Sequence, residues 1–535
     1  MVRSNEILDV IIVGTGFSGI YGLHRMREAG FRVLAIEAGD DVGGCWYWNR
    51  YPGLRCDVDS LEYAYGFSEE LQRDWRWSER YALQPEIQSY ISFAADRLGV
   101  RQDIRFNTRI ASATFDNAVG IWTLASENGE TFRARFVIMA TGCLSIPNKP
   151  NLPGIDAFEG RLIHSVQWPD EKPDLSDKNV AVIGTGSTGV QMIPLLAREA
   201  KHLTVVQRTP AFCVPARNQP LNDARIDYWR TNFRQLREMA RNTRAGVLHE
   251  YGLLPAAAVR PEDRIADLER RWIKGGPNVL YAFSDPLLDE EANRLVSDFL
   301  RGKIAEAVND PETAMKLTPH EYPVGTKRVC VGTDYYETYN RDNVTLIDLR
   351  SEKLERIEPH GIRTDKGFHP VDVLILATGY DAITGALLAV DIRTTSGKSL
   401  REEWRNGPET YLGLGIAGFP NMFVVTGPGS PSVFSNMVLS GEHDMDWFTH
   451  CLTFLRDNGY STIEADGRAQ AEWMDHVDEI AGRTLVNRAA SWYRGANVDG
   501  KPQRFMPYVG GVNTYQAKCR EVAALGYEGF VIGSE

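Results

Sequence analysis

Two glycine-rich runs are the residues best suited to hold a charged ligand. Each follows a short β-branched segment and precedes a stretch with helical character, which gives the order strand, glycines, helix. The runs are Gly14-Thr15-Gly16-Phe17-Ser18-Gly19 and Gly184-Thr185-Gly186-Ser187-Thr188-Gly189. Glycines in this G-x-G-x-x-G spacing let the N-terminus of a helix approach a pyrophosphate. The sequence therefore predicts two dinucleotide sites in one chain.

The residue that ends the next strand distinguishes the two sites. Glu37 ends the strand after the first run, and a carboxylate there accepts hydrogen bonds from ribose hydroxyls. The same place in the second unit holds Arg208 and Thr209, a guanidinium and a hydroxyl that suit a 2′-phosphate. We therefore expect FAD at the first site and NADP(H) at the second. A chain with both sites is a flavoprotein reduced by NADPH, in which the flavin supplies the redox chemistry.

Spacing alone leaves open what oxidises the flavin. A disulfide reductase would need a second cysteine close to Gly43-Gly44-Cys45, but the next one is Cys56, beyond a long aromatic segment. We therefore exclude that class. An NADPH-dependent electron carrier, a monooxygenase in which reduced flavin reacts with O2, and a redox-sensing binder without catalysis all remain.

Residues 158–169 favour the monooxygenase. They carry the pattern F-x-G-x-x-x-H-x-x-x-W-P, formed by Phe158, Gly160, His164, Trp168 and Pro169, which resembles the fingerprint of type I Baeyer–Villiger monooxygenases. Further segments similar to this family are 43–53, 325–328, 335–343, 377–381 and 491–497. The resemblance covers essentially the whole chain. Within the phenylacetone, steroid and cyclohexanone monooxygenase group, residues 427–432 are most similar to the phenylacetone and steroid branch.

The resemblance implies an FAD- and NADPH-dependent oxidoreductase. Such an enzyme inserts one oxygen atom from O2 next to a ketone carbonyl, through a C4a-peroxyflavin, and gives an ester or lactone. The peroxide anion and its adduct carry negative charge, so a permanently charged donor should lie beside them. Arg328 matches the catalytic arginine of the family, and Asp57 matches an aspartate expected to orient it. The alternative is a flavin-containing monooxygenase that oxygenates nitrogen or sulfur.

The resemblance also assigns contacts with the cofactors and the substrate. Lys327 and Arg208 match residues that hold the 2′-phosphate, and Trp492 matches an indole near the nicotinamide. The expected cofactor-binding residues are Gly14, Gly16, Phe17, Ser18, Gly19, Glu37, Gly44, Trp46, Trp48, Asp57, Tyr63, Gly184, Thr185, Gly186, Ser187, Thr188, Gly189, Gln191, Arg208, Thr209, Lys327, Arg328 and Trp492. The expected substrate pocket is mostly apolar and suits a hydrophobic ketone; its residues are Val58, Cys143, Leu144, Ser432, Val433, Phe434 and Met437.

Three positions carry more specific expectations. Cys143 stands where the phenylacetone type has a glutamine, and Phe434 is bulkier than the usual residue, so the substrate range should differ. His164 lies in a linker between the two nucleotide units. We therefore expect it to couple the domains rather than to act as a base, with Trp168 as an aromatic anchor and Pro169 as a rigid turn.

An α/β framework has to bring these residues together. Apolar strands are predicted at 10–13, 33–36, 136–140, 179–183, 203–206 and 373–377. We predict two discontinuous Rossmann-like dinucleotide-binding domains. The FAD domain comprises residues 1–143 and 381–535, and the NADP domain comprises 144–221 and 320–380. Residues 222–319 are charged and helical, and we expect them to form an insertion that caps the second unit. Residues 440–490 are also mostly helical.

Composition narrows the class further. The 535 residues include 59 Lys and Arg against 71 Asp and Glu, a net charge of −12, which argues against nucleic acid or an anionic membrane as a partner. A 43% hydrophobic content excludes general disorder. Seven cysteines without a C-x-x-C pair indicate reduced thiols. With no apolar segment long enough for a membrane helix and no secretory signal, we expect a cytoplasmic enzyme without a metal or an obligatory protein partner.

Overall fold

The first sheet forms around the strand that precedes the first glycine run. The computed structural model describes residues 6–534. Within it, β1 (Ile7–Val13) runs parallel to β2 (Val33–Ile36) on one side and to β6 (Thr131–Met139) on the other. Residues 10–13 are all buried, as expected of an apolar strand in the interior of a parallel sheet. The remaining strands are β3 (Ile104–Arg105), β4 (Ile110–Asp116), β5 (Ile121–Ser126), β17 (Asp391–Thr394) and β18 (Met422–Val424).

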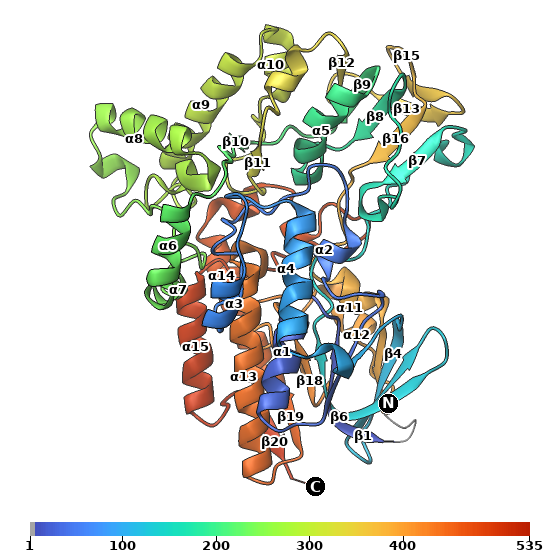
Figure 1. Ribbon diagram of the computed structural model, residues 1–535, viewed down its shortest axis with the longest axis vertical. Helices are drawn as coiled ribbons and strands as arrows, with labels where there is room; N and C mark the ends of the chain where they lie inside the picture. The colour runs from blue at the N-terminus through green and yellow to red at the C-terminus, as the bar shows by residue number, and fades with distance from the viewer. Residues whose placement is uncertain (1–5, 535) are drawn as a thin grey trace.

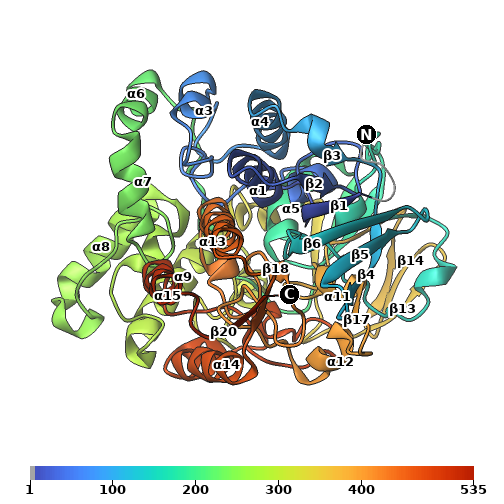
Figure 2. The same cartoon turned by 90° about the horizontal axis from the view of Figure 1, so that it is seen from below.

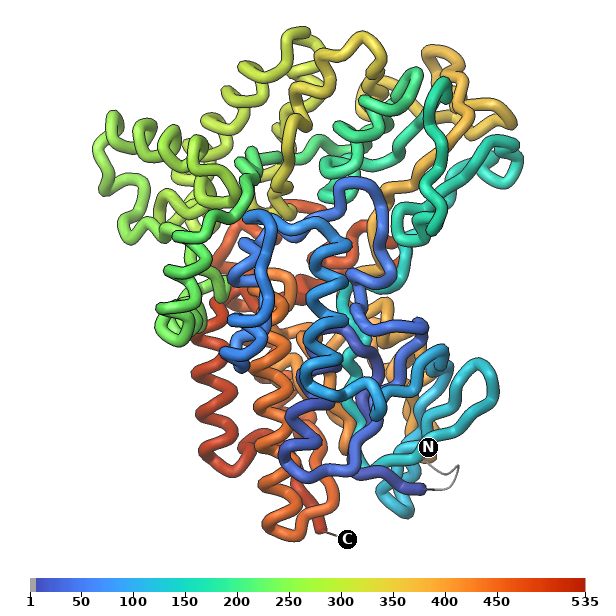
Figure 3. The backbone as a smooth tube through the Cα atoms, in the orientation of Figure 1, coloured from blue at the N-terminus to red at the C-terminus, as the bar shows by residue number. Residues whose placement is uncertain are grey.

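Strands from the C-terminal part of the chain complete this sheet. The order is β17-β4-β5-β6-β1-β2-β3, and β18 pairs in parallel with β6 through Met422 and Val137. Strand β17 pairs with β4 through Asp391 and Ser112. Figure 3 shows the early and late parts of the chain lying together in the lower half of the molecule. The first unit is thus built from two separate segments of the chain. The residue ranges of the FAD and NADP domains stay predictions.

A second sheet carries the second glycine run. Its strands are β7 (Arg161–His164), β8 (Asn179–Ile183), β9 (His202–Gln207), β12 (Val344–Asp348) and β16 (Val373–Leu376). They lie in the order β12-β9-β8-β16-β7, and every pair is parallel. Helix α5 (Ser187–Glu199) connects β8 to β9, which makes the expected βαβ unit (Figure 1). The fold is therefore α/β with two Rossmann-like units.

Helix α1 (Phe17–Glu28) follows the first glycine run, and α13 (Met437–Asp457) lies along it (Figure 2). Gly22 permits this close approach, because a Cβ there would lie 2.5 Å from Met445 Sδ. The other helices outside the insertion are α2 (Cys45–Trp48), α3 (Glu69–Asp74), α4 (Gln84–Arg97), α11 (Gly385–Ala389), α12 (Leu400–Glu403), α14 (Gly467–Gly482) and α15 (Val512–Ala524).

The insertion is helical, but it does not simply cap the second unit. Its helices are α6 (Asp223–Thr231), α7 (Phe233–Arg241), α8 (Pro261–Lys274), α9 (Glu290–Ala307) and α10 (Pro311–Leu317). Trp229 of α6 and Phe233 of α7 belong to the same apolar core as Val10 of the first sheet. The expectation that the insertion caps the second unit is therefore wrong for α6 and α7, because their apolar faces are buried against the first unit. Helices α8 and α9 share a separate small core.

Short pairings complete the structure. Strand β10 (Cys213–Pro215) pairs in parallel with β11 (Cys330–Gly332), and β19 (Thr462–Ala465) pairs antiparallel with β20 (Phe530–Gly533). A three-stranded antiparallel sheet contains β13 (Leu354–Glu358), β14 (Gly361–Thr364) and β15 (Gly367–Pro370). In residues 6–534 we find no helix with the length and apolar character needed to cross a membrane.

Candidate active site

The first glycine run forms a tight turn with no room for side chains. A Cβ on Gly14 would lie 2.5 Å from the carbonyl oxygen of Ala140, and one on Gly44 would lie 2.9 Å from Gly16 Cα. Gly14 and Gly44 also have positive φ angles of 104° and 56°. The backbone at the N-terminus of α1 is thus open for close approach, which fits the pyrophosphate of FAD.

Glu37 is held rigidly at the end of β2. Its Oε2 accepts hydrogen bonds from Thr15 N at 2.9 Å and Thr15 Oγ1 at 2.8 Å, and its Oε1 accepts one from Gly39 N at 2.9 Å. The side chain is buried. A carboxylate oxygen has two acceptor positions, so Oε1 keeps one for a ribose hydroxyl. This arrangement fits an unphosphorylated adenosine.

Aromatic side chains line the segment beside this turn. Trp46 Nε1 donates to Tyr63 Oη at 3.2 Å, and the rings of Phe17 and Tyr63 pack edge to face at 5.3 Å. Trp48 lies apart, 39% exposed, with the Arg109 guanidinium 5.6 Å from its ring. Ser18 lies against α13. Its hydroxyl is so close to Gly441 that a Cβ on that glycine would collide with it. The structure thus groups Phe17, Trp46 and Tyr63 but leaves Trp48 outside the cluster.

The second glycine run repeats the turn on the second sheet. Cβ atoms on Gly184 and Gly189 would collide with the carbonyl oxygens of Ala377 and Gly184, whereas one on Gly186 would meet no atom within 4 Å. Thr185 Oγ1 donates to the Thr209 carbonyl at 3.1 Å, which joins the turn to the end of β9. The N-terminus of α5, with Ser187 and Thr188, is therefore accessible to a phosphate.

Two cations lie together beside this turn. Arg208 is exposed after β9, and Lys327 is partly buried with its Nζ 5.1 Å from the centre of the Tyr322 ring. Burial and the charge of Arg208 lower the pKa of Lys327. The charge of Glu321 acts on Lys327 in the opposite direction, but Glu321 forms its ion pair with Arg350 at 2.9 Å. Within residues 6–534, Arg208 and Lys327 thus form no ion pair of their own, which fits the 2′-phosphate of NADP(H).

Gln191, expected to contact a nucleotide, makes hydrogen bonds to the first unit. Its Oε1 accepts a hydrogen bond from Tyr51 Oη at 3.0 Å, and its Nε2 donates to the Arg55 carbonyl at 3.0 Å. The amide therefore fastens α5 to residues 51–55 of the first unit. We find its side chain engaged between the two units rather than free for a nucleotide.

Arg328 and Asp57 form the ion pair that the sequence analysis anticipates. Nε and Nη2 of Arg328 both donate to Asp57 Oδ2, at 2.9 and 2.5 Å, and Nη1 donates to the Val433 carbonyl at 3.0 Å. The charge of Asp57 is the main cause of a raised Arg328 pKa, so the guanidinium stays protonated. Three of its five N–H groups are used in these contacts, which leaves two donors for another oxygen.

The expected pocket residues gather next to this pair. Cys143, Leu144, Val433, Phe434, Met437 and Trp492 belong to one apolar cluster. Ser432 is fully buried at a positive φ of 43°, and its hydroxyl has no hydrogen-bond partner among the described residues. Val58 packs instead against the core of the first unit. Since Val433 also accepts from Arg328, the pocket and the charged pair are directly joined.

Sequence reasoning missed three aromatic neighbours of the pair. Tyr493 is buried, and its ring packs at a tilt of 51° against both Trp492, at 4.4 Å between ring centres, and Phe434, at 4.7 Å. Burial raises its pKa to about 12. His249 stacks on Tyr281 at 4.7 Å. Burial is the main cause that lowers the pKa of His249 to about 3, and Arg328 adds to it. Only Tyr493 had a signal in the sequence, since it falls within the matched segment 491–497.

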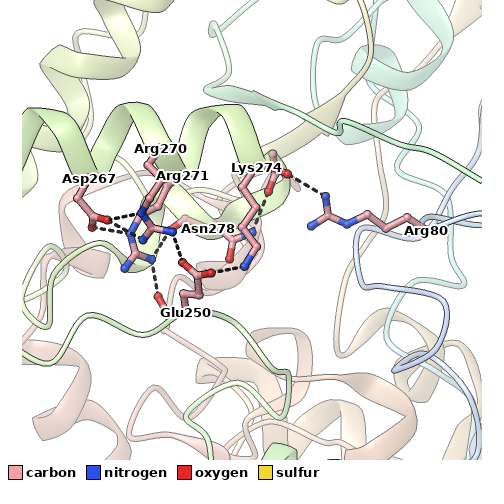
Figure 4. Close-up of polar contacts among 8 residues, drawn as sticks. Arg80, Glu250, Asp267, Arg270, Arg271, Lys274 and Asn278 are labelled. Carbon is pink, nitrogen blue, oxygen red and sulfur yellow. Dashed lines mark hydrogen bonds and ion pairs between the residues drawn. The ribbon is translucent and has the colours of Figure 1, made fainter. Parts of the chain in front are cut away.

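A charged network fixes the segment that carries His249. Glu250 accepts hydrogen bonds from Lys274 and Arg270 of α8, and Arg271 donates to the Glu250 carbonyl (Figure 4). These contacts lower the pKa of Glu250 to about 2, with the hydrogen bond from Lys274 as the largest cause. Arg80 of the first unit donates to the Lys274 carbonyl at 3.0 Å. The network therefore joins α8 to the segment between α3 and α4.

Among the fingerprint residues, His164 makes contacts that lead from the second sheet toward the C-terminal part of the chain. His164 ends β7, and its Nδ1 accepts a hydrogen bond from Val166 N at 3.2 Å. Its Nε2 lies 3.2 Å from the Asn148 carbonyl, and Asn148 Nδ2 donates to the Asn497 carbonyl at 2.8 Å. Burial lowers the pKa of His164. A neutral His164 ring with both nitrogens in hydrogen bonds fits a role in coupling the two nucleotide units.

The rest of the fingerprint supports the turns around the second sheet. Trp168 is buried in its core, and Phe158 packs on its other side. A Cβ on Gly160 would lie 2.5 Å from the Asp372 carbonyl. Pro169 follows Trp168 at the surface end of this segment.

Comparisons with known proteins agree with this geometry. The profile of the family described as pyridine nucleotide-disulphide oxidoreductase matches residues 8–232. The chain is 41% identical to phenazine N-monooxygenase PhzNO1 of Lysobacter antibioticus, over 98% of this chain and 97% of that protein. It is 38% identical to a Baeyer–Villiger monooxygenase of Pseudooceanicola batsensis, over 98% and 96%. The structure of oxidized steroid monooxygenase bound to NADP superimposes with a TM-score of 0.94, at 44% identity, over 99% and 100%.

The match to a disulphide oxidoreductase profile reflects the shared nucleotide-binding fold. All seven cysteines are free, and no second thiol accompanies Cys45 in the spacing such a reductase needs. The fold prediction and the choice of FAD and NADP as cofactors are confirmed. With full-length relatives well above 30% identity, the chain belongs to the Baeyer–Villiger monooxygenases.

Proposed function

We propose that this enzyme oxidises a hydrophobic ketone, with Arg328 and Asp57 as its catalytic pair. The balanced reaction is ketone, O2, NADPH and one proton to ester or lactone, NADP⁺ and water. The observation that carries the proposal is the pair of unused N–H donors on Arg328, a guanidinium held by Asp57 and Val433 beside an apolar pocket. Those donors are placed to bind an oxygen on which negative charge develops.

FAD, when bound and reduced, supplies the transfer of one oxygen atom from O2. Arg328 orients the ketone carbonyl and stabilises its oxygen as the carbon becomes tetrahedral. Asp57 accepts two hydrogen bonds from Arg328, and so fixes the plane of the guanidinium. The pair Arg208 and Lys327 positions the nucleotide through its 2′-phosphate, and the apolar cluster around Tyr493 excludes water.

The pocket supports a ketone with an apolar body. Cys143 and Val433 are buried and Phe434 is partly buried, so the pocket offers little hydrogen bonding beyond the Arg328 pair. Burial raises the pKa of the Cys143 thiol to about 11, which keeps it neutral near pH 7. Phe434 restricts the space near Tyr493, 4.7 Å away between ring centres. We infer a preference for aryl or cyclic ketones that can pack against these rings.

Replacement of Arg328 tests the proposal. Arg328→Ala should lower the rate of ester formation by about 10²–10³-fold, because one donor to a developing oxyanion has that effect. Arg328→Lys keeps the charge but loses the fork that binds Asp57, so it should recover little. The assay follows ester by mass spectrometry with phenylacetone, and NADPH consumption by absorbance. Consumption of NADPH without ester is the expected outcome; a wild-type yield of ester from Arg328→Ala would refute the role.

A second candidate is oxygenation of a heterocyclic nitrogen. It is favoured by the phenazine N-monooxygenase at 41% identity. A nitrogen lone pair takes up oxygen without forming a carbonyl oxyanion, so this reaction needs Arg328 less. Parallel assays with phenazine and phenylacetone separate the two. If Arg328→Ala keeps N-oxide formation while losing ester, the enzyme has both activities and only ester formation needs Arg328. If wild type gives only N-oxide, the ketone proposal is wrong.

The setting of the reaction follows from the same residues. Both nucleotide turns and the Arg328–Asp57 pair come from one chain, so we propose that no partner protein is needed. Seven free thiols and the use of NADPH are the reasons to place the enzyme in the cytoplasm.

A further inference from the structure

A polar cavity of about 330 Å³ lies between α7, α13 and α15. These three helices are neighbours in both views of the molecule (Figures 1 and 2). The cavity is lined by Glu238 and Arg241 of α7, by Glu442, His443 and Asp446 of α13, and by Gln516 and Arg520 of α15, with Asn242 and Leu439 beside them. Its lining shares no residue with the active site described above, so a ligand here would be a separate one.

The carboxylates on α13 that line the cavity already have partners. Glu442 accepts a hydrogen bond from the buried Arg237 at 3.1 Å, in an ion pair whose side chains are 3% and 4% exposed. Asp446 Oδ1 accepts hydrogen bonds from Arg25 Nε and Tyr21 Oη, each at 2.8 Å. These two negative charges are therefore compensated by residues outside the cavity.

Three of the hydrogen-bond donors that line the cavity are not satisfied. In the part of the chain described, Arg520 makes no ion pair, whereas Arg241 Nη1 forms a long one, 3.8 Å from Oε2 of Glu238, which also lines the cavity. Gln516 is only 5% exposed, yet its amide makes no hydrogen bond within residues 6–534. Nε2 of His443 is buried without a partner. Buried polar groups normally have a partner, so such a group beside a cavity calls for a ligand or water.

The unpaired groups face a common space. Burial lowers the pKa of His443 to about 4, and the charges of Arg520 and Arg241 act on it in the same direction. His443 is therefore neutral near pH 7, with an N–H available to donate. Two guanidinium groups, an amide and an imidazole share this volume with the carboxylates of Glu238, Glu442 and Asp446, each of which has its own partner. The groups left without a partner belong to Arg520, Gln516 and His443, and such donors recognise oxyanions through charge-assisted hydrogen bonds.

We propose that this cavity binds a small polar molecule through a carboxylate or phosphate group. Arg520 and Arg241 hold the charge, and Gln516 and His443 bind its polar body. The volume exceeds that of one phosphate ion, so the ligand is an organic acid or a phosphate ester. The proposal stands apart from the assignment of the active site.

Calorimetry on the holoenzyme tests this proposal. The protein carries FAD and is saturated with NADP⁺, so that Arg208 and Lys327 cannot take up the added anion. Citrate and inorganic phosphate are titrated separately. We expect at least one to bind, and Arg520→Gln to weaken that binding by about tenfold or more. Gln516→Leu should also weaken it. The matched control is Arg468→Gln, whose side chain is 86% exposed on α14, and which should leave the affinity unchanged.

The outcomes separate clearly. Binding of citrate alone assigns the site to carboxylates, and binding of phosphate alone assigns it to phosphate groups. Absence of binding by both anions overturns the proposal, as does an unchanged affinity in Arg520→Gln. If the diamine putrescine binds and neither anion does, the carboxylates determine the charge preference of the cavity. This result would also contradict the proposal. Because Arg520 is exposed, its replacement should leave the melting temperature unchanged, and this is measured alongside.

Discussion

At the residue scale, we propose that the choice of nucleotide depends on two cations and one carboxylate. Glu37 is fixed by three donors on the first unit, whereas Arg208 and Lys327 lie near each other on the second, where the charge of Arg208 lowers the pKa of Lys327. The first arrangement accepts ribose hydroxyls, and the second attracts a phosphate. The same local fold thus separates FAD from NADP through the residue that follows one strand.

Removal of either cation should weaken the preference for NADPH over NADH. A hydrogen bond to a charged group contributes about 1.5–3 kcal/mol, which corresponds to roughly 10–100-fold in kcat/KM. Arg208→Ala or Lys327→Ala should therefore lower kcat/KM for NADPH by that factor and leave NADH nearly unaffected. Steady-state kinetics with both nucleotides measures it, with Arg198→Ala on α5 as the exposed control. Equal losses with both nucleotides would contradict phosphate recognition.

The lowered pKa of Lys327 makes this recognition sensitive to pH. Lys327 loses its proton at a lower pH than an ordinary lysine, so the KM for NADPH should begin to rise before pH 10. Lys327→Arg, which stays protonated throughout, should flatten that rise. Profiles of KM between pH 7 and 10 compare the two proteins. A rise of the same size in both would assign it to another group.

Asp444 should make the folding stability depend on pH. Burial raises its pKa to about 8, and its Oδ1 has no partner, while Oδ2 accepts from Thr426 N at 2.8 Å. Between about pH 4 and pH 8 the folded protein holds a proton that the unfolded chain has lost, so this group lowers the stability as pH rises. Asp444→Asn should remove that decline. Urea unfolding at pH 5 and pH 8 tests it; the variant should gain stability at pH 8 but not at pH 5.

At the element scale, α7 is joined to α13 by a buried ion pair. Arg237 contacts Glu442 and also donates to the Glu62 carbonyl at 2.9 Å. This contact holds the start of the insertion against the first unit, beside the core that contains Trp229 and Phe233. The insertion is thus anchored at its beginning, and the segment with His249 is anchored by the network around Glu250.

A double-mutant cycle measures how α7 and α13 depend on each other. Arg237→Met should cost about 3–5 kcal/mol of unfolding free energy, because it leaves the buried Glu442 without its partner. Adding Glu442→Met should restore much of that loss, since no isolated charge then remains. Urea unfolding of the two single variants and the double variant gives the coupling. Strictly additive losses would show that the two side chains do not act as a pair.

Local sequence signals explain which elements and site residues could be predicted. The two glycine runs, Glu37 and Arg208 follow strands directly, so position along the chain was enough to place them. Arg328 and Asp57 came only from the family resemblance, because nothing local sets them apart. His249, Tyr281 and the Glu250 network gave no signal, since their partners are distant in sequence and charged residues usually face solvent. The packing of α6 and α7 was missed because an apolar helix face does not reveal which neighbour covers it.

At the scale of the whole molecule, a few polar contacts join the two nucleotide units. Gln191 reaches Tyr51 and Arg55, and His164 reaches Asn148, which continues to Asn497. The Arg328–Asp57 ion pair also spans both units, since Arg328 precedes β11 and Asp57 follows the first glycine run. Relative movement of the units would therefore alter this pair.

Replacement of His164 distinguishes coupling from acid–base chemistry. His164→Leu leaves the Val166 N–H without its acceptor, which costs about 1–3 kcal/mol of local order. We expect kcat to fall by roughly tenfold, with FAD content retained and the shape of the pH–rate profile unchanged. The measurement is kcat/KM from pH 6 to 10 with phenylacetone. Disappearance of an ionisation from the profile would instead identify His164 as a base.

The pairing of β18 with β6 has a consequence for biosynthesis. Met139, at the end of β6, emerges from the ribosome long before Val424, its partner in β18. At about 5–20 residues per second, the roughly 280 intervening residues take about 15–60 s to translate. Until residue 391 is reached the nascent first sheet lacks both β17 and β18, and β18 arrives last, while all five strands of the second sheet have become available. The NADP-binding half can therefore mature first, and the N-terminal segment must be kept from aggregating until the C-terminal segment arrives.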